Sequence, residues 1–302
     1  MKAISKNVLA AFAAAAGLVF VLPVNLHAGE EFTLETARVA AEKGDARAEY
    51  FLAKQYAKGK DVPQDFAKAV EYLRRAAEQN LAFAENDLGA YYAKGLGVKK
   101  DYAEAAKWYR KAAEQGDALA QFSMGRIYAM GRGVPQDMQE SVKWFKKAAE
   151  QNQPDALEML GDIYLKGRKD IAVDFAQAMK YFKAAVQQGR INALNSIGFM
   201  YEHGHGIEIN PERAVACYRE AAEKNDARAQ MNLGRMYEEG FGVKKDLVEA
   251  YKWFLLAQRN GEGTGTHYLQ ELEDNYHVTA DQIAEAQQRA SAFTHSRTKE
   301  KS

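Results

Sequence analysis

The apolar positions of this chain recur with a helical period over most of its length. Ala84, Leu88 and Tyr92 follow one another at four-residue spacing, which places them on one face of a helix. Gly89, beside the leucine, would let a neighbouring helix approach closely. After a short glycine-containing loop, a second helical pattern begins near Asp101 and ends with two alanines. The pattern therefore predicts a helix, a tight loop and a second helix.

This helix–loop–helix pattern repeats along the chain. The Leu-Gly pair or its equivalent recurs every 36 residues, with one interval of 37. Six such units span residues 45–261 and predict an all-α solenoid, in which each unit buries its apolar face against its neighbours. The six pairs are Leu52-Ala53, Leu88-Gly89, Met124-Gly125, Leu160-Gly161, Ile197-Gly198 and Leu233-Gly234.

The second helix of each unit begins at a residue that can cap it. These N-cap residues are Asp65, Asp101, Asp137, Asp174, Asn210 and Asp246. Seven residues after each cap, we expect a core residue: Tyr72, Trp108, Trp144, Tyr181, Cys217 and Trp253. A row of aromatic residues could also form a ligand cage, but we interpret it as helix packing. Cys217 is accordingly interpreted as a small buried hydrophobic residue and not as a nucleophile.

The two ends differ from the repeats. Lys2 and Lys6 precede a 17-residue uncharged run, and Leu26-His27-Ala28 follows it, which is typical of a secretory signal peptide, residues 1–28, cleaved after Ala28. The alternative is a retained membrane anchor, which the short run and Pro23 disfavour. We predict an N-terminal capping helix within 29–44, C-terminal capping helices within 262–294, the last ending near Phe293, and a polar tail over 295–302.

The composition excludes several classes of function and site. The chain of 302 residues carries 41 basic and 41 acidic residues, and the basic residues form no block, so a nucleic-acid binder is not expected. A single cysteine excludes an intrachain disulfide framework and a cysteine-built zinc site. We also expect no membrane span once the signal peptide is removed.

Candidate chemistry is sparse. None of the common catalytic or phosphate-binding motifs occurs, and the one Ser-x-x-Lys motif, Ser296 to Lys299, lies in the polar tail. His203 and His205 follow Glu202 and could hold a metal, yet further ligands are not visible, so we interpret them as surface loop residues. We therefore expect no catalytic residue, no cofactor and no metal.

The recurring residues resemble the Sel-one-like repeat, a relative of the tetratricopeptide repeat. The residues that carry the resemblance are Ala-x-Ala-x-x-x-Leu-Gly-x-x-Tyr-x-x-Gly-x-Gly-Val and the Asp, Ala, Trp and Ala-Ala that follow. The resemblance covers nearly all of the chain after residue 28, although the first unit departs at Ala53 and at its loop, Lys60-Asp61, and the fourth at the longer loop over residues 167–171. It implies an α-solenoid that serves as a binding scaffold, with the first helices lining its concave side.

The predicted function is a non-enzymatic scaffold or regulator of the bacterial envelope, periplasmic or secreted and monomeric, that binds a protein or peptide on its concave side. The alternatives are an envelope enzyme acting on cell-wall material or β-lactams, and a secreted host-interaction factor. The exposed face of the first helices supplies the predicted partner-binding residues. They are Phe83, Asn86, Leu119, Phe122, Arg126, Asp155, Glu158, Asp162, Asn195 and Phe199. The apolar members of this set could instead pack between adjacent first helices.

Overall fold

The computed structural model describes residues 32–299, and only the backbone of residues 295–299. The described residues are helical apart from turns and one isolated bridge between Arg168 and Ile171. The helices are α1 (Leu34–Glu42), α2 (Ala46–Lys58), α3 (Phe66–Glu78), α4 (Ala82–Lys94), α5 (Tyr102–Glu114), α6 (Ala118–Met130), α7 (Met138–Glu150), α8 (Pro154–Lys166), α9 (Phe175–Gln187), α10 (Asn192–His203), α11 (Pro211–Glu223), α12 (Ala227–Glu239), α13 (Leu247–Arg259), α14 (Gly265–Asn275) and α15 (Ala280–Lys299).

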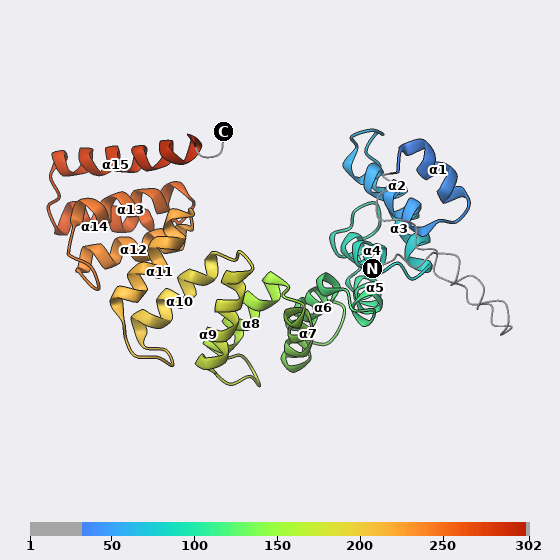
Figure 1. The fold of residues 1–302 in the computed structure, drawn as a ribbon, viewed down its shortest axis with the longest axis horizontal. Helices are drawn as coiled ribbons and strands as arrows, with labels where there is room; N and C mark the ends of the chain where they lie inside the picture. The colour runs from blue at the N-terminus through green and yellow to red at the C-terminus, as the bar shows by residue number, and fades with distance from the viewer. Residues whose placement is uncertain (1–31, 300–302) are drawn as a thin grey trace, which may run out of the picture.

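The helices form six stacked pairs, which we number as units one to six from α2–α3 to α12–α13. Contacts run mainly between consecutive helices, so each unit packs on the next. The stack bends into an open arc, with α6 and α8 toward its inside and α7 and α9 toward its outside (Figure 1). The predicted all-α solenoid is therefore confirmed, and the first helices of the units form its inner layer.

Units two to six are each held together by an aromatic ring that lies against a glycine. A Cβ atom built on Gly125 would lie 2.5 Å from two ring carbons of Phe145, and Gly161 and Phe182 show the same contact. The ring belongs to the second helix, eight residues after its N-cap. Glycine is therefore required because a methyl group would separate the two helices.

The prediction for this row of core residues is confirmed only in part, because the most deeply buried residues lie one position later. Residues eight after the cap are the deeply buried ones, and Phe145, Phe182, Tyr218 and Phe254 are all 0% exposed. Of the residues seven after the cap, Trp144 and Trp253 are buried, whereas Tyr72, Trp108, Tyr181 and Cys217 are half-buried. Successive helical positions differ by about 100° around the axis, so the two rows face different neighbours. The residues seven positions after the cap also pack against neighbouring helices, but four of the six are only half-buried.

Unit one shows the same contact with smaller residues. Ala53 stands where the other units have glycine, and Leu73 stands where they have an aromatic ring. Both are buried, at 1% exposure each. The added methyl group of the alanine is thus matched by a side chain without a ring, which keeps the helices in contact.

Polar bridges join a buried residue of the first helix of a unit to an exposed residue at the end of its second helix. Gln115 Nε2 donates to Glu85 Oε2 at 2.5 Å in unit two, and Gln151 Nε2 donates to Gln121 Oε1 at 2.9 Å in unit three. Unit six has the same bridge between Asn260 and Gln230. Because buried polar groups cost free energy unless they are paired, these bridges keep the polar residues in the interior.

The loops and the C-terminal end depart from the repeat in two places. In unit four, the backbone groups of Arg168 and Ile171 exchange hydrogen bonds of 2.9 Å, which closes the longer loop as a tight turn. Helix α15 continues to Lys299, although the polar pattern predicted that it ends near Phe293 and that a tail follows. No glycine or proline interrupts residues 294–299, so nothing in that segment stops the helix.

The predicted signal peptide, residues 1–28, lies outside the described residues. None of the helices in the described part is long and apolar enough to cross a lipid bilayer.

Candidate functional site

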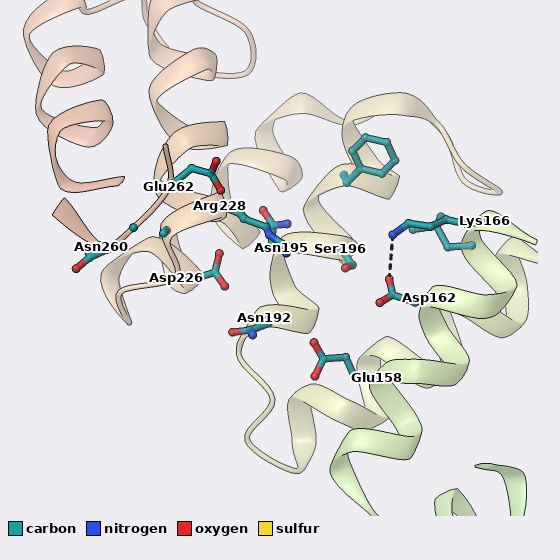
Figure 2. Close-up of a pocket in the computed structure, with 14 residues that line it drawn as sticks. Glu158, Asp162, Lys166, Asn192, Asn195, Ser196, Asp226, Arg228, Asn260 and Glu262 are labelled. Carbon is teal, nitrogen blue, oxygen red and sulfur yellow. Dashed lines mark ion pairs between the residues drawn. The ribbon is translucent and has the colours of Figure 1, made fainter. Parts of the chain in front are cut away.

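A groove crosses the inner layer where the first helices of units four, five and six meet. Its volume is about 690 Å³, and its lining comes mainly from α8, α10 and the start of α12. Glu158 and Asp162 come from α8, and Asn192 and Asn195 come from α10, with the Asn192 side chain on the side toward Asp226 (Figure 2).

The groove is polar and carries more acid than base. Four carboxylates line it, together with the two cations Lys166 and Arg228. Lys166 Nζ lies 3.8 Å from Asp162 Oδ1, a distance that leaves this pair loosely held. Burial raises the pKa of Glu158 above its usual value, and the neighbouring charges of Asp162 and Asp226 raise it further. The carboxylates are therefore close enough to repel one another, and a positively charged group would stabilise them.

Amide side chains give the groove hydrogen-bonding capacity of both kinds. Asn192 and Asn260 are exposed at its edges, and Asn195 is half-buried in its floor. Asn195 Oδ1 accepts a hydrogen bond of 2.8 Å from Asn232 of the next unit. Each amide offers two donor hydrogens and an acceptor oxygen, so the groove can pair with the N–H and C=O groups of an extended peptide.

The predicted partner-binding residues do not form one continuous surface. Glu158, Asp162, Asn195 and Phe199 line the groove. Phe83 and Leu119 lie outside it on units two and three, where they are exposed by 61% and 55%. Asn86 is half-buried in unit two.

Phe122 and Arg126 do not form one exposed patch with these residues. Phe122 is half-buried, and its ring centroid lies 5.6 Å from that of Phe145 in the core. It therefore packs against the second helix of its own unit, and not between adjacent first helices as the alternative interpretation held. Arg126 lines a different cavity, between α4, α5 and α6.

Two of the predicted partner-binding residues of unit four, Asp155 and Glu158, are partly neutralised by a cation. Arg190, in the turn before α10, forms an ion pair with Asp155, and its Nε lies 3.5 Å from Glu158 Oε2. Asp155 does not line the groove. Sequence periodicity missed this pairing because Arg190 belongs to a turn and not to a helix face.

The inter-unit turns also supply groove residues that the sequence did not single out. Asp226 caps α12 through its side chain, and Asn260 and Glu262 follow α13. All three line the groove. Their position at the ends of helices places them beside the first helix of a neighbouring unit, which a helical-face argument does not consider.

His203 and His205 lie among aromatic rings. The His205 ring stacks on Phe175 with centroids 4.8 Å apart, and the His203 ring lies 4.2 Å from that of Phe199. In the part of the chain that the structure describes, no three His, Cys, Asp or Glu side chains are arranged to hold a metal ion. Burial raises the pKa of the Cys217 thiol to about 11, so it is protonated and a poor nucleophile at neutral pH.

Comparison with known proteins identifies the repeat. Six consecutive segments match the model of the Sel1 repeat: 46–81, 82–117, 118–153, 154–189, 191–226 and 227–262. A comparison with curated proteins finds no match.

Two solved structures are similar over most of the chain. One is a protective antigen of uropathogenic Escherichia coli with an SLR fold, which is 34% identical and has a TM-score of 0.78. The alignment covers 87% of this chain and 56% of that one. This chain thus spans about half the length of that relative. The other is a Sel1 repeat protein of Oxalobacter formigenes, 34% identical with a TM-score of 0.69, with 75% of this chain and 88% of that one covered.

Proposed function

Because this chain belongs to the Sel1 repeat family, whose members are generally non-catalytic protein-interaction scaffolds, we propose that it is a non-enzymatic scaffold of the bacterial envelope. Its binding site is the groove across α8, α10 and α12, and its partner is an extended peptide segment of another protein. The groove carries this proposal, because it is an open polar surface of about 690 Å³ formed by three successive units.

The chemistry of the groove selects the kind of segment. Asn192, Asn195 and Asn260 offer donors and acceptors to a peptide backbone. The excess of carboxylates over cations favours Lys or Arg in the segment. Phe199, which is 36% exposed beside them, offers an apolar or cation–π contact.

Export is supported by the N-terminal sequence. The basic start, the uncharged run and the small residue Ala28 together favour passage across the inner membrane. Export is also compatible with the description of one relative as a protective antigen. The scaffold would then work in the periplasm or outside the cell.

The function is tested by affinity capture from an envelope fraction with the tagged protein and two double variants. Asn192→Ala with Asp162→Ala removes one amide and one carboxylate of the groove, from α10 and α8. Gln187→Ala with Glu223→Ala is the matched control, because these residues make the same change of charge and are exposed on the second helices α9 and α11. Circular dichroism and the thermal midpoint establish that all three proteins are folded.

We expect the wild type and the control to retain the same partner and the groove variant to lose at least about nine-tenths of it, which corresponds to roughly 1.4 kcal/mol of binding free energy. Equal retention by the folded groove variant would place the binding site elsewhere. Turnover of muropeptides or β-lactams by the purified protein would contradict the non-enzymatic role.

A further inference from the structure

A buried carboxylate is held between units five and six by a tyrosine and an arginine. Tyr218, the ring that packs on Gly198, donates a hydrogen bond of 2.6 Å from its hydroxyl to Glu202 Oε2. Arg235 of α12 forms an ion pair with the other carboxylate oxygen. The Glu202 side chain is only 8% exposed, so the tyrosine and the arginine supply the partners that a buried carboxylate requires.

The same tyrosine and arginine recur at the junction of units two and three, without the carboxylate. Tyr109 packs on Gly89 as Tyr218 packs on Gly198. Counting from each glycine, the tyrosine lies 20 residues later and the arginine 37 residues later, which gives Tyr109 and Arg126. The glutamate lies 4 residues after Gly198, and the corresponding residue after Gly89 is Ala93.

No other junction of the six units repeats this pair. The residues at the tyrosine and arginine positions are Leu73 and Ala90 in one case and Phe145 and Asp162 in another. After Gly161 the count is one residue longer because of the extra loop residue of unit four, and the positions hold Phe182 and Phe199. The Tyr–Arg pair therefore occurs twice, once with an internal carboxylate and once with an alanine methyl group in its place.

A cavity lies where the carboxylate is missing. It has a volume of about 360 Å³, and Ala93, Tyr109, Ser123 and Arg126 contribute to its lining. The Tyr109 side chain is largely buried and has a hydrogen bond with Ser123. A tyrosine hydroxyl can donate one hydrogen bond and accept others, so Tyr109 can still donate to a carboxylate when it accepts from Ser123.

The mouth of this cavity is positively charged. Lys94, Lys100 and Arg132 line it together with Arg126, and no acidic side chain of the described chain does so. The hydrogen bond from Lys100 lowers the pKa of Tyr102 at the mouth, and the nearby Arg132 adds to this effect. Four cations around one concave surface attract anions more strongly than any one of them would alone.

We propose that the cavity between α4, α5 and α6 is a carboxylate-binding site for an acidic peptide segment of a partner. Tyr109 and Arg126 hold one carboxylate in the way that Tyr218 and Arg235 hold Glu202. Lys94, Lys100 and Arg132 pair with further acidic side chains or a terminal carboxylate. The inference adds a second site to the proposed scaffold function, at the opposite half of the arc from the acidic groove.

The test is fluorescence polarisation of the whole protein with a labelled tetra-Glu peptide and a matched tetra-Gln peptide. We expect saturable binding of the tetra-Glu peptide and at least roughly tenfold weaker binding of the tetra-Gln peptide. Equal binding of the two peptides, or binding of neither, would overturn the proposal.

The decisive variant is Ala93→Glu, which supplies from the chain itself the carboxylate that unit five already has. It should fold with an unchanged or higher thermal midpoint and bind the tetra-Glu peptide at least roughly tenfold more weakly, because the internal carboxylate occupies Tyr109 and Arg126. Ala57→Glu is the control. It makes the same change of charge at the same position of unit one, where Leu73 and Ala90 replace the tyrosine and arginine.

The control should bind the tetra-Glu peptide within about twofold of the wild type. An equal loss in both variants would mean that net charge alone governs binding, and full binding by the folded Ala93→Glu protein would place the peptide elsewhere. Arg126→Ala gives a second measurement, with an expected loss of at least roughly tenfold. If these peptide tests fail while the acidic groove still captures its partner, the carboxylate-binding site is refuted and the proposed scaffold function is not.

Discussion

The ring of Phe145 lies so close to Gly125 that a Cβ atom on the glycine would come within 2.5 Å of it. Gly89, Gly161, Gly198 and Gly234 have the same contact with the ring of the following helix. This contact sets the distance between the two helices of a unit. Unit one, with Ala53 and Leu73, indicates how the sequence accommodates a methyl group at the glycine position.

The first prediction is that Gly125→Ala destabilises the protein by about 1–3 kcal/mol, because overpacking forces the helices apart. The double change Gly125→Ala with Phe145→Leu reproduces the residues of unit one. It should cost less than the sum of the two single changes, as measured by chemical denaturation in a double-mutant cycle. Strictly additive free energies would show that the ring and the glycine do not constrain each other.

The second prediction compares the two rows of aromatic residues. Phe145 is 0% exposed, whereas Trp108 of the row that the sequence favoured is only half-buried. Phe145→Ala should therefore cost about 3–5 kcal/mol and Trp108→Ala clearly less, since less of its surface leaves water. Denaturation curves should be compared together with their slopes, because solenoid units can unfold separately. A larger loss of unfolding free energy for Trp108→Ala than for Phe145→Ala would mean that the residues seven positions after the cap form the core row.

The third prediction concerns a buried glutamate in the polar bridge of unit two. Glu85 is 0% exposed, and its Oε1 has no hydrogen-bond partner in the described structure. Burial raises its pKa, an effect that the charge of Lys111 only partly offsets. When an acid has a higher pKa in the folded than in the unfolded state, it lowers the free energy of unfolding of the protein as the pH rises. The loss begins near the unfolded pKa and is complete above the folded pKa.

Glu85→Gln should therefore stabilise the protein by about 1 kcal/mol at pH 7, and the gain should disappear in acid where Glu85 is protonated. Gln121 occupies this position in unit three, and its Nε2 donates to the Ala113 carbonyl oxygen at 3.2 Å. The control is Glu49→Gln at the same position of unit one. Glu49 lies 2.6 Å from an Arg75 nitrogen, so its replacement should lower stability. Thermal midpoints of both variants at acid and neutral pH check the direction of each stability change. A lower midpoint of Glu85→Gln at pH 7 would contradict the prediction.

The fourth prediction concerns processing of the N-terminus. N-terminal sequencing of protein isolated from the periplasm should begin at Gly29 or within a few residues of it. Replacing apolar residues 18–20 by charged ones should leave the full-length chain in the cytosol. A full-length chain in the cytosol of the unaltered strain would contradict export.

The all-α class, the six units and the turns between them could be predicted from the residue pattern. These follow from local rules, because a helical period, an N-cap and a glycine after a helix act within a few residues. The Leu-Gly pair also indicated that a helix would approach closely. Periodicity could not say which ring fills the space at the glycine, since adjacent positions of the second helix both carry large side chains.

Features that combine residues of different units become visible only in the folded chain. Phe122 packs against Phe145, so its replacement would disturb the fold and is no test of an exposed patch. Arg190 neutralises part of unit four from a turn. The stacking of units four to six brings the lining of the groove together. It likewise places Tyr109 and Arg126 at one cavity and joins both Tyr218 and Arg235 to Glu202. Such pairs lie 17 residues apart, and no helical period predicts their contact, because it depends on how one unit rotates against the next.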